Sequence, residues 1–323
     1  MANNRIFYAC QAVAVKHRPY NTTSEIWDTT GAIEQLEGVQ SVGINTNFNL
    51  EQIFELGQLE IYENVEGIPE VEVTVEKALD NKPLVYHACS TPNEKVTQTT
   101  QDRADVSIAI YPDSGNADGI ETNQVAHVKA TGMYVSSVSY TFSVDGNATE
   151  SITFVGNSKT WTASDATNPD DTDDGTAAPA AGGVVRREDF DLSGSTIPST
   201  VSNAGKLQSV TISSDFSRED ILELGSFVPY YRAAGFPIEV SCEFEVVATD
   251  GDNVTVSEGG GNISDETIII KAGNSSQYVF DLGTKNKLTS IAYGGGDAGG
   301  GNATITFGYI NYNDLKVNGP AVA

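Results

Sequence analysis

The residues of this chain that could do chemistry are mostly carboxylates, and two stretches space them regularly. Residues 70–77 read EVEVTVEK and residues 238–246 read IEVSCEFEV. Paired carboxylates can serve as general acid and base, but strict alternation is also what a strand with one solvated face requires. We interpret both stretches as half-buried strands rather than as a catalytic pair. The acids concerned are Glu70, Glu72, Glu76, Glu239, Glu243 and Glu245.

Other reactive residue types lack the spacing that chemistry needs. The histidines, His17, His87 and His127, form no HExxH or other metal-ligand pattern, and three widely spaced cysteines give neither a disulfide framework nor a zinc knuckle. The glycine cluster at residues 294–302 lacks the Lys-Ser/Thr of a phosphate loop, and the aspartates from residue 170 lack the glutamate that ends a calcium loop. We therefore expect no enzyme activity, no metal and no cofactor.

The acidic balance limits the partners. There are 44 acidic and 18 basic residues, for a formal charge of −26. Neutralising phosphates takes clustered Lys and Arg, so specific nucleic-acid binding is not expected, although the charge could keep nucleic acid from sticking or maintain solubility. No signal peptide and no apolar run of membrane-spanning length is present, which predicts a cytoplasmic product without a membrane segment.

One stretch occurs twice. Residues 39–69 and residues 207–237 align without a gap, and 13 of the 31 paired positions are identical. Each copy predicts a strand, a short helix that ends at Gly57 or Gly225, a turn, and an alternating strand. Because the second alternating strand is slipped by one residue, we expect a small insertion or bulge. The apolar residues of the two expected helices are Leu50, Ile53, Phe54, Leu56, Ile221, Leu222 and Leu224.

A second pair of similar segments follows in the same order. Residues 135–156 and 288–311 both read as hairpins, with DGNAT and GGNAT near their turns. We predict a mainly β chain with two tandem sandwich or barrel domains, each with a short flanking α-helix. The first covers residues 1–161 and the second residues 184–323. Residues 162–183, acidic and rich in Ala, Gly and Pro, are expected to form a linker or loop. Residues 5–16 are expected to form the first strand, and residues 17–38 a long polar connection.

The repeated segments resemble the major tail tube proteins of tailed bacteriophages. The resemblance rests on QSVGINTNFNLEQIFELGQLEIYENVEGIPEVEVTVEK and its copy, on the hairpin VSYTFSVDGNATESITFVGNSKTW, and on RREDFDLSGSTIP. It covers about two-thirds of the chain. It implies a virion protein, made in the bacterial host cytoplasm, whose rings stack into the tail tube. In such rings the inner strands close into a barrel around a channel.

The resemblance also implies partners. They are further copies of the chain, the tape measure protein, and tail tip and terminator proteins, while DNA passes through without specific binding. Rings of this family carry six single domains, so a duplicated chain is expected to form rings of three. Whether the tail is contractile, with a sheath around the tube, is left open.

The candidate residues take roles within this expectation. The seven apolar helix residues are expected to pack within their own domain or against a neighbouring subunit. The six glutamates are expected to line the channel, where they would repel DNA, or to face outward into solvent. The competing interpretation of the whole chain is a β-sandwich binding module on a virion or cell surface.

Overall fold

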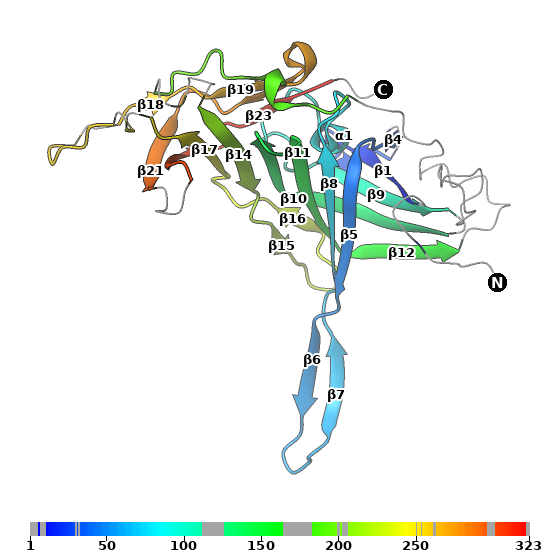
Figure 1. The fold of residues 1–323 in the computed structure, drawn as a ribbon. Helices are drawn as coiled ribbons and strands as arrows, with labels where there is room; N and C mark the ends of the chain where they lie inside the picture. The colour runs from blue at the N-terminus through cyan, green and yellow to red at the C-terminus, as the bar shows by residue number, and fades with distance from the viewer. Residues whose placement is uncertain are drawn as a thin grey trace.

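The computed structural model describes residues 6, 11–29, 31, 33–111, 126–163, 183–198, 201, 206–249, 251–252, 254–260, 263–295 and 301–320. Within these residues the protein is mainly β, with one large antiparallel sheet and several smaller sheets (Figure 1). The expected mainly β class is confirmed.

The large sheet holds 13 strands. They are β1 (Gln11–Arg18), β4 (Ile33–Gln35), β5 (Val39–Asn47), β8 (Glu70–Ala78), β9 (Arg103–Ile110), β10 (Ala126–Ser143), β11 (Thr149–Gly156), β12 (Ser158–Ala163), β14 (Leu207–Asp215), β17 (Glu239–Val247), β18 (Asp265–Glu266), β21 (Asn286–Gly294) and β22 (Thr304–Tyr312).

The smaller sheets and helices complete the described fold. A four-stranded sheet contains β13 (Phe190–Asp191), β19 (Ile269–Ala272), β20 (Tyr278–Asp281) and β23 (Lys316–Asn318). Three strand pairs are β2 (Tyr20–Asn21) with β3 (Ile26–Trp27), β6 (Leu50–Phe54) with β7 (Ile61–Glu66), and β15 (Glu219–Ile221) with β16 (Tyr231–Ala233). The helical segments are α1 (Val85–Cys89), η3 (Arg187–Asp189) and η4 (Asn274–Ser276).

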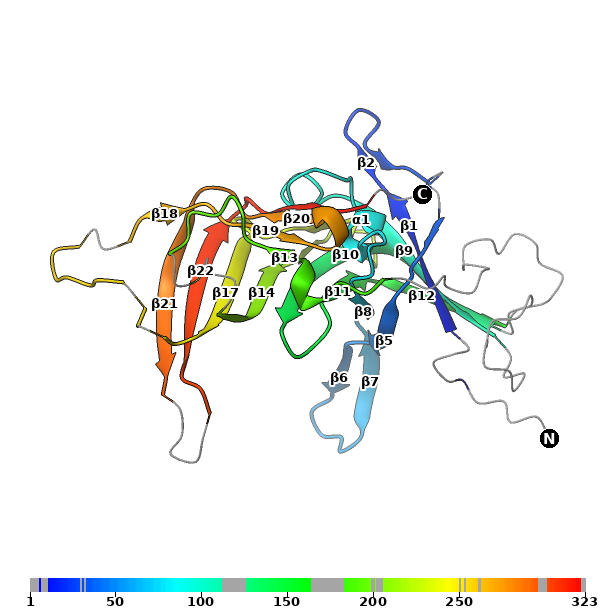
Figure 2. The ribbon, with the colours of Figure 1, turned by 45° about the horizontal axis from the view of Figure 1, so that its top comes forward.

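The main path of the large sheet runs β18-β21-β22-β17-β14-β10-β11-β8-β5 (Figure 2). The strands from both halves of the sequence therefore form one continuous surface. They meet where β10 pairs antiparallel with β14.

The path contains one four-strand arrangement twice. β5-β8-β11-β10 comes from the first half and β14-β17-β22-β21 from the second. The registers correspond: Asn47 pairs with Glu70 where Asp215 pairs with Glu239. Each copy also has an irregularity at the start of its first strand and another in its hairpin. The repeat seen in the sequence is thus a repeat of backbone pairing.

The core lies on one face of this sheet. Alternate side chains such as Val73, Phe244 and Phe307 are fully buried there. Phe280 of the four-stranded sheet packs against Tyr140, with ring centroids 4.5 Å apart. The small sheet thus covers part of the large one, which leaves the opposite face for polar residues.

The two expected helices were wrong. Residues 50–54 form strand β6 and residues 219–221 form strand β15, each paired within a hairpin. At the base of each hairpin Asn49 and Ser217 have φ of 47° and 44°, in the left-handed region, where a residue cannot serve as the expected extended N-cap. A two-turn helix is marginal without a surface to cover, whereas a hairpin satisfies its backbone groups between its own strands.

The remaining expectations from the sequence concern the strands, the hairpins, the polar connection and the linker. The alternating strands and both hairpins are confirmed, and Ile238 is the extra residue that absorbs the one-residue slip. The first strand is confirmed from residue 11 onward, and its expected earlier part, apart from residue 6, lies outside the described residues. The connection of residues 17–38 contains three short strands rather than loop alone. The linker of residues 162–183 lies outside the described residues, apart from its two ends.

Candidate functional site

The six candidate glutamates project from one face of the large sheet. Val71, Val73 and Val75 of β8 are buried on the core face, so the glutamates between them point to the opposite side, and β17 repeats the pattern. Five of the six are exposed and Glu245 is half-buried. The two groups lie on different strands, separated by β11, β10 and β14. The sheet therefore presents two acidic stripes rather than a carboxylate pair.

Each stripe has the same hydroxyl partner. Ser41 Oγ donates to Glu76 Oε2 at 3.2 Å, and Ser209 Oγ donates to Glu245 Oε2 at 3.1 Å. These contacts are equivalent in the two repeats. They hold the carboxylates on the polar face without neutralising their charge.

The apolar residues expected on helices lie on two hairpins. We call residues 48–68 the first arm and residues 216–236 the second arm. The first arm extends away from the rest of the protein (Figure 1). Six of the seven candidates are exposed and Ile221 is half-buried. The structure therefore does not show the expected packing of these side chains within the chain. The exposed ones are Leu50, Ile53, Phe54, Leu56, Leu222 and Leu224.

The second arm is held against strands of the first half. Arg218 Nε donates to the carbonyl oxygen of Val135 and its Nη1 donates to that of Thr100, both at 2.7 Å. The rings of Tyr134 and Tyr231 meet edge to face with centroids 6.0 Å apart. Burial lowers the pKa of Arg218 to about 10, which leaves the guanidinium charged at neutral pH.

An alternating stack of aromatic and cationic groups continues this contact. The Arg103 guanidinium lies 3.4 Å from the centroid of Trp27 and 4.9 Å from that of Tyr134, and Arg218 lies 5.1 Å from the same tyrosine. The sequence did not predict this stack. Its only signal was that Arg218 stands where the first repeat has Leu50, which marks the two arms as chemically different.

The first arm has no equivalent support among the described residues. Phe216, at the base of the second arm, is 1% exposed, and its amide donates to the carbonyl oxygen of Ser136 in β10 at 2.8 Å. Phe48, the matching residue of the first arm, is 60% exposed. Nine large apolar side chains of the first arm are exposed, Leu56 and Leu59 fully, and its five glutamates are exposed as well. The arm is thus an apolar, acidic hairpin without a cover.

The main path of the large sheet ends in open strand edges. Within the described residues β5 pairs only with β8, and residues 288–294 of β21 pair only with β22. β5 is the counterpart of β14, and β21 is the counterpart of β10. The two open edges therefore correspond to the two strands that join inside the chain. Exposed backbone donors and acceptors on such edges can pair with another strand.

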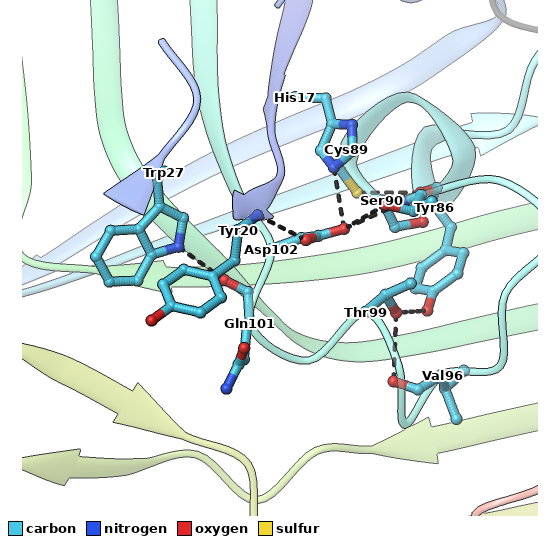
Figure 3. Close-up of polar contacts among 11 residues, drawn as sticks. His17, Tyr20, Trp27, Tyr86, Cys89, Ser90, Val96, Thr99, Gln101 and Asp102 are labelled. Atoms are coloured by element: carbon cyan, nitrogen blue, oxygen red, sulfur yellow. Dashed lines mark hydrogen bonds and ion pairs between the residues drawn. The ribbon is translucent and has the colours of Figure 1, made fainter. Parts of the chain in front are cut away.

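A cluster around Asp102 superficially resembles a catalytic arrangement (Figure 3). Asp102 Oδ2 lies 3.0 Å from His17 Nε2, and Asp102 Oδ1 accepts from the Tyr20 amide at 3.2 Å. Thr91 donates to Asp102 Oδ2 through both its amide and its hydroxyl. Cys89 is nearby in the chain, but its Sγ donates to the Tyr86 carbonyl, and burial raises the pKa of its thiol well above the usual value. Asp102 therefore fastens residues 17–20 to the body of the protein.

Trp27, which looks isolated in the sequence, belongs to the same region. Its indole Nε1 donates to the Gln101 carbonyl at 2.8 Å, and its ring lies 5.1 Å from that of Tyr20. Together with Arg103 these contacts tie the hairpin of β2 and β3 to the base of β9.

The described part of the chain shows neither a metal-binding cluster nor a membrane-spanning helix. No group of three or more His, Cys, Asp or Glu side chains is arranged to hold a metal ion there. None of the helices described is long and apolar enough to cross a membrane.

No protein-family model matches the sequence, and no curated protein matches it either. The features of the molecule that bear on its function are therefore the repeat, the open edges, the arms and the acidic face.

Proposed function

We propose that this chain is a structural protein that assembles with copies of itself into closed rings, and that these rings stack into the tail tube of a tailed bacteriophage. One observation carries the proposal. The two four-strand units follow one another head to tail in a single sheet, which leaves at its ends the counterparts of the two strands that join in its middle. A head-to-tail contact of this kind can repeat, and closure into a ring covers both of these open edges.

Each half is then a tube-like domain, and each chain fills two positions of a ring. Three chains would complete a ring with pseudo-sixfold symmetry. Each contributes the eight strands from β21 to β5, so three chains supply 3 × 8 = 24 strands. With strands about 4.8 Å apart and tilted by about 40°, such a barrel is about 48 Å across its backbone, which leaves room for a DNA duplex.

The acidic face fits the inside of such a channel. With the core and the four-stranded sheet on one side, the polar face with its six glutamates is the side that can turn toward the lumen. Negative charge there repels phosphates, so DNA can slide without being held. The tape measure protein would occupy the channel before DNA, and tip and terminator proteins would bind the ends of the tube.

A β-sandwich binding module on a virion or cell surface is the second candidate. The observation in its favour is the Tyr20–Trp27 pair on the hairpin of β2 and β3, since aromatic pairs on loops are common in ligand sites. It predicts a monomer or small oligomer with a ligand at that hairpin.

Electron microscopy in negative stain, with light-scattering mass on the same sample, tests the proposal. The expected result is stacked rings or hollow tubes with ring units of about 103 kDa, three times the chain mass of 34.3 kDa. A ring of six chains would contradict the pseudo-sixfold arrangement. If the protein stays monomeric, purified tail tips are added as a nucleus; continued failure to polymerise would favour the binding module.

A further inference from the structure

We propose that neighbouring chains join through β21 and β5 in the register of the internal β10·β14 junction, and that the first arm then lies on the neighbour's β21 with Glu63 facing Lys287. This inference rests on the proposed self-assembly. It adds which residues meet, in which register, and what chemistry distinguishes the contact between chains from the one within a chain.

The register follows from the correspondence of the two repeats. Inside the chain Ser139 pairs with Ser213 and Tyr140 pairs with Ile212. The hairpin registers place Ala292 and Tyr293 of β21 at the positions of Ser139 and Tyr140, because each pair faces equivalent residues of β11 and β22. The strand registers likewise place Asn45 and Ile44 of β5 at the positions of Ser213 and Ile212. Between chains Ala292 therefore pairs with Asn45, and Tyr293 with Ile44.

The exposure of these residues agrees with a missing partner. Tyr140 and Ile212 are fully buried where the internal strands meet. Tyr293 is 65% exposed at the open edge. Pairing with a second copy would place it beside Ile44, on the face that continues the core.

The open part of β21 begins where the internal junction would begin. The short strand β18 pairs with β21 at Asn286 and Lys287 and then stops. In the first half β9 pairs with β10 as far as Met133, and β14 takes over that side from Ser137. Residues 290–294 are therefore the stretch of β21 that corresponds to the part of β10 covered by β14.

The first arm completes the contact by analogy with the second. Phe216, Arg218 and Tyr231 of the second arm meet Ser136, Val135 and Tyr134 of β10. The corresponding residues are Phe48, Leu50 and Glu63 on the first arm and Thr289, Leu288 and Lys287 on β21.

The chemistry at these positions changes in a complementary way. Leu50 stands where Arg218 donates to the carbonyl oxygen of Val135, so this hydrogen bond has no counterpart at Leu288 and the contact there would be apolar. Glu63 replaces one tyrosine where Lys287 replaces the other, which gives a charge pair in place of an aromatic pair. Lys287 also contacts Asp265 in its own chain, at 3.0 Å, but both side chains are well exposed and the lysine can contact a second acid. Complementary changes on both sides favour the junction between copies over an unrelated cover.

Cysteine crosslinking tests the register. In a background with Cys10→Ser, the variant Asn45→Cys/Ala292→Cys is assembled, oxidised with copper phenanthroline and run on a non-reducing gel. Crosslinked dimers and trimers are expected. Ser139→Cys/Ser213→Cys is the matched internal control, because these positions pair within one chain and should give a crosslinked monomer. Asn47→Cys/Ala292→Cys, shifted by two residues on the same face, should crosslink at least tenfold less.

Charge reversal tests the arm contact. Glu63→Lys and Lys287→Glu should each weaken assembly and raise the critical concentration at least tenfold. The double variant should restore the wild-type critical concentration. Tubes that form without the Asn45–Ala292 crosslink would overturn this junction and leave the proposed function standing. Equal crosslinking of the shifted pair, or singles that assemble normally, would also overturn it. A protein that never assembles, even with tail tips, would overturn both.

Discussion

A buried acid on β11 shows how single residues separate two otherwise equivalent repeats. Glu150 accepts hydrogen bonds from the amides of Val85 and Tyr86, at 2.7 and 3.0 Å, at the start of α1. No side chain at Leu84 caps this helix, so the carboxyl group from the neighbouring strand takes that role. The second repeat has Ile305 at the position of Glu150. The acid is thus present in the repeat in which the amides at the start of a helix need a hydrogen-bond acceptor.

Glu150→Gln should change how stability depends on pH. Burial raises the pKa of Glu150 above its usual value of 4.5, so the folded protein holds this proton more tightly than the unfolded chain does. Its contribution to stability is complete below pH 4.5 and is lost as pH rises through the folded pKa. The glutamine variant should lack this loss, as measured by denaturant unfolding between pH 4 and about pH 8. The exposed Glu243→Gln is the control and should keep the wild-type profile; identical profiles for all three proteins would contradict the assignment.

Asp102→Ala should release the segment of residues 17–28. The change removes the acceptor for the amides of Tyr20 and Thr91, for the Thr91 hydroxyl, and for His17. Because each bond contributes about 1 kcal/mol, we expect a loss of about 2–4 kcal/mol in the free energy of unfolding. Hydrogen exchange at residues 20–28 should rise with it. Asp145→Ala, an exposed acid in a hairpin turn, should leave both unchanged.

The two arms show at the scale of elements how one sequence pattern meets two environments. Both begin with a phenylalanine and close through a glycine, since the Gly67 amide donates to Asn49 and the Gly235 amide donates to Ser217. The second arm lies on β10, while the first has no described neighbour on its corresponding side. The cover that β10 gives the second arm therefore accounts for the difference in exposure between Phe216 and Phe48.

Phe48→Ala and Phe216→Ala form a matched pair that tests this difference. Phe216 is buried, so its loss should cost about 3–4 kcal/mol of stability in the isolated chain. Phe48 is exposed, so its loss should cost less than about 0.5 kcal/mol there, but it should weaken assembly. Thermal unfolding at a protein concentration too low for assembly measures the loss of stability, and sedimentation of tubes measures the loss of assembly. Equal destabilisation of both monomers would show that Phe48 is already covered.

The alternating strands and the hairpins could be predicted from the sequence because a period of two and a turn signal are local properties. The arms could not, because Leu50, Ile53 and Phe54 fit one face of a helix as well as they fit a hairpin. The choice depended on the left-handed backbone at Asn49 and on the absence of a surface for a helix. The six glutamates could be assigned to one side of their strands. The continuity of that side across β10 and β14 is a long-range pairing that no local pattern encodes.

At the scale of the whole molecule, the continuous sheet gives the acidic side chains a common direction. Glu72 and Glu243 lie on different repeats, yet both project from the polar face, away from the buried valines and phenylalanines. In a closed ring every copy of that face turns to the same side. The potential there is a sum over all chains, so it depends on closure as well as on composition.

Reversing charge on this face should slow DNA passage without preventing assembly. Glu72→Lys/Glu243→Lys changes each chain by four charges at exposed positions of β8 and β17, which are not edge strands of the large sheet. Added lysines in a channel attract phosphates, so particles built from the variant should eject their genome more slowly, by about tenfold at low salt and less at high salt. Glu188→Lys/Glu258→Lys makes the same charge change at exposed sites outside the large sheet and should eject normally. Intact tubes with unchanged ejection kinetics in both variants would place the acidic face outside the channel, because a lumen of reversed charge could not leave the passing DNA unaffected.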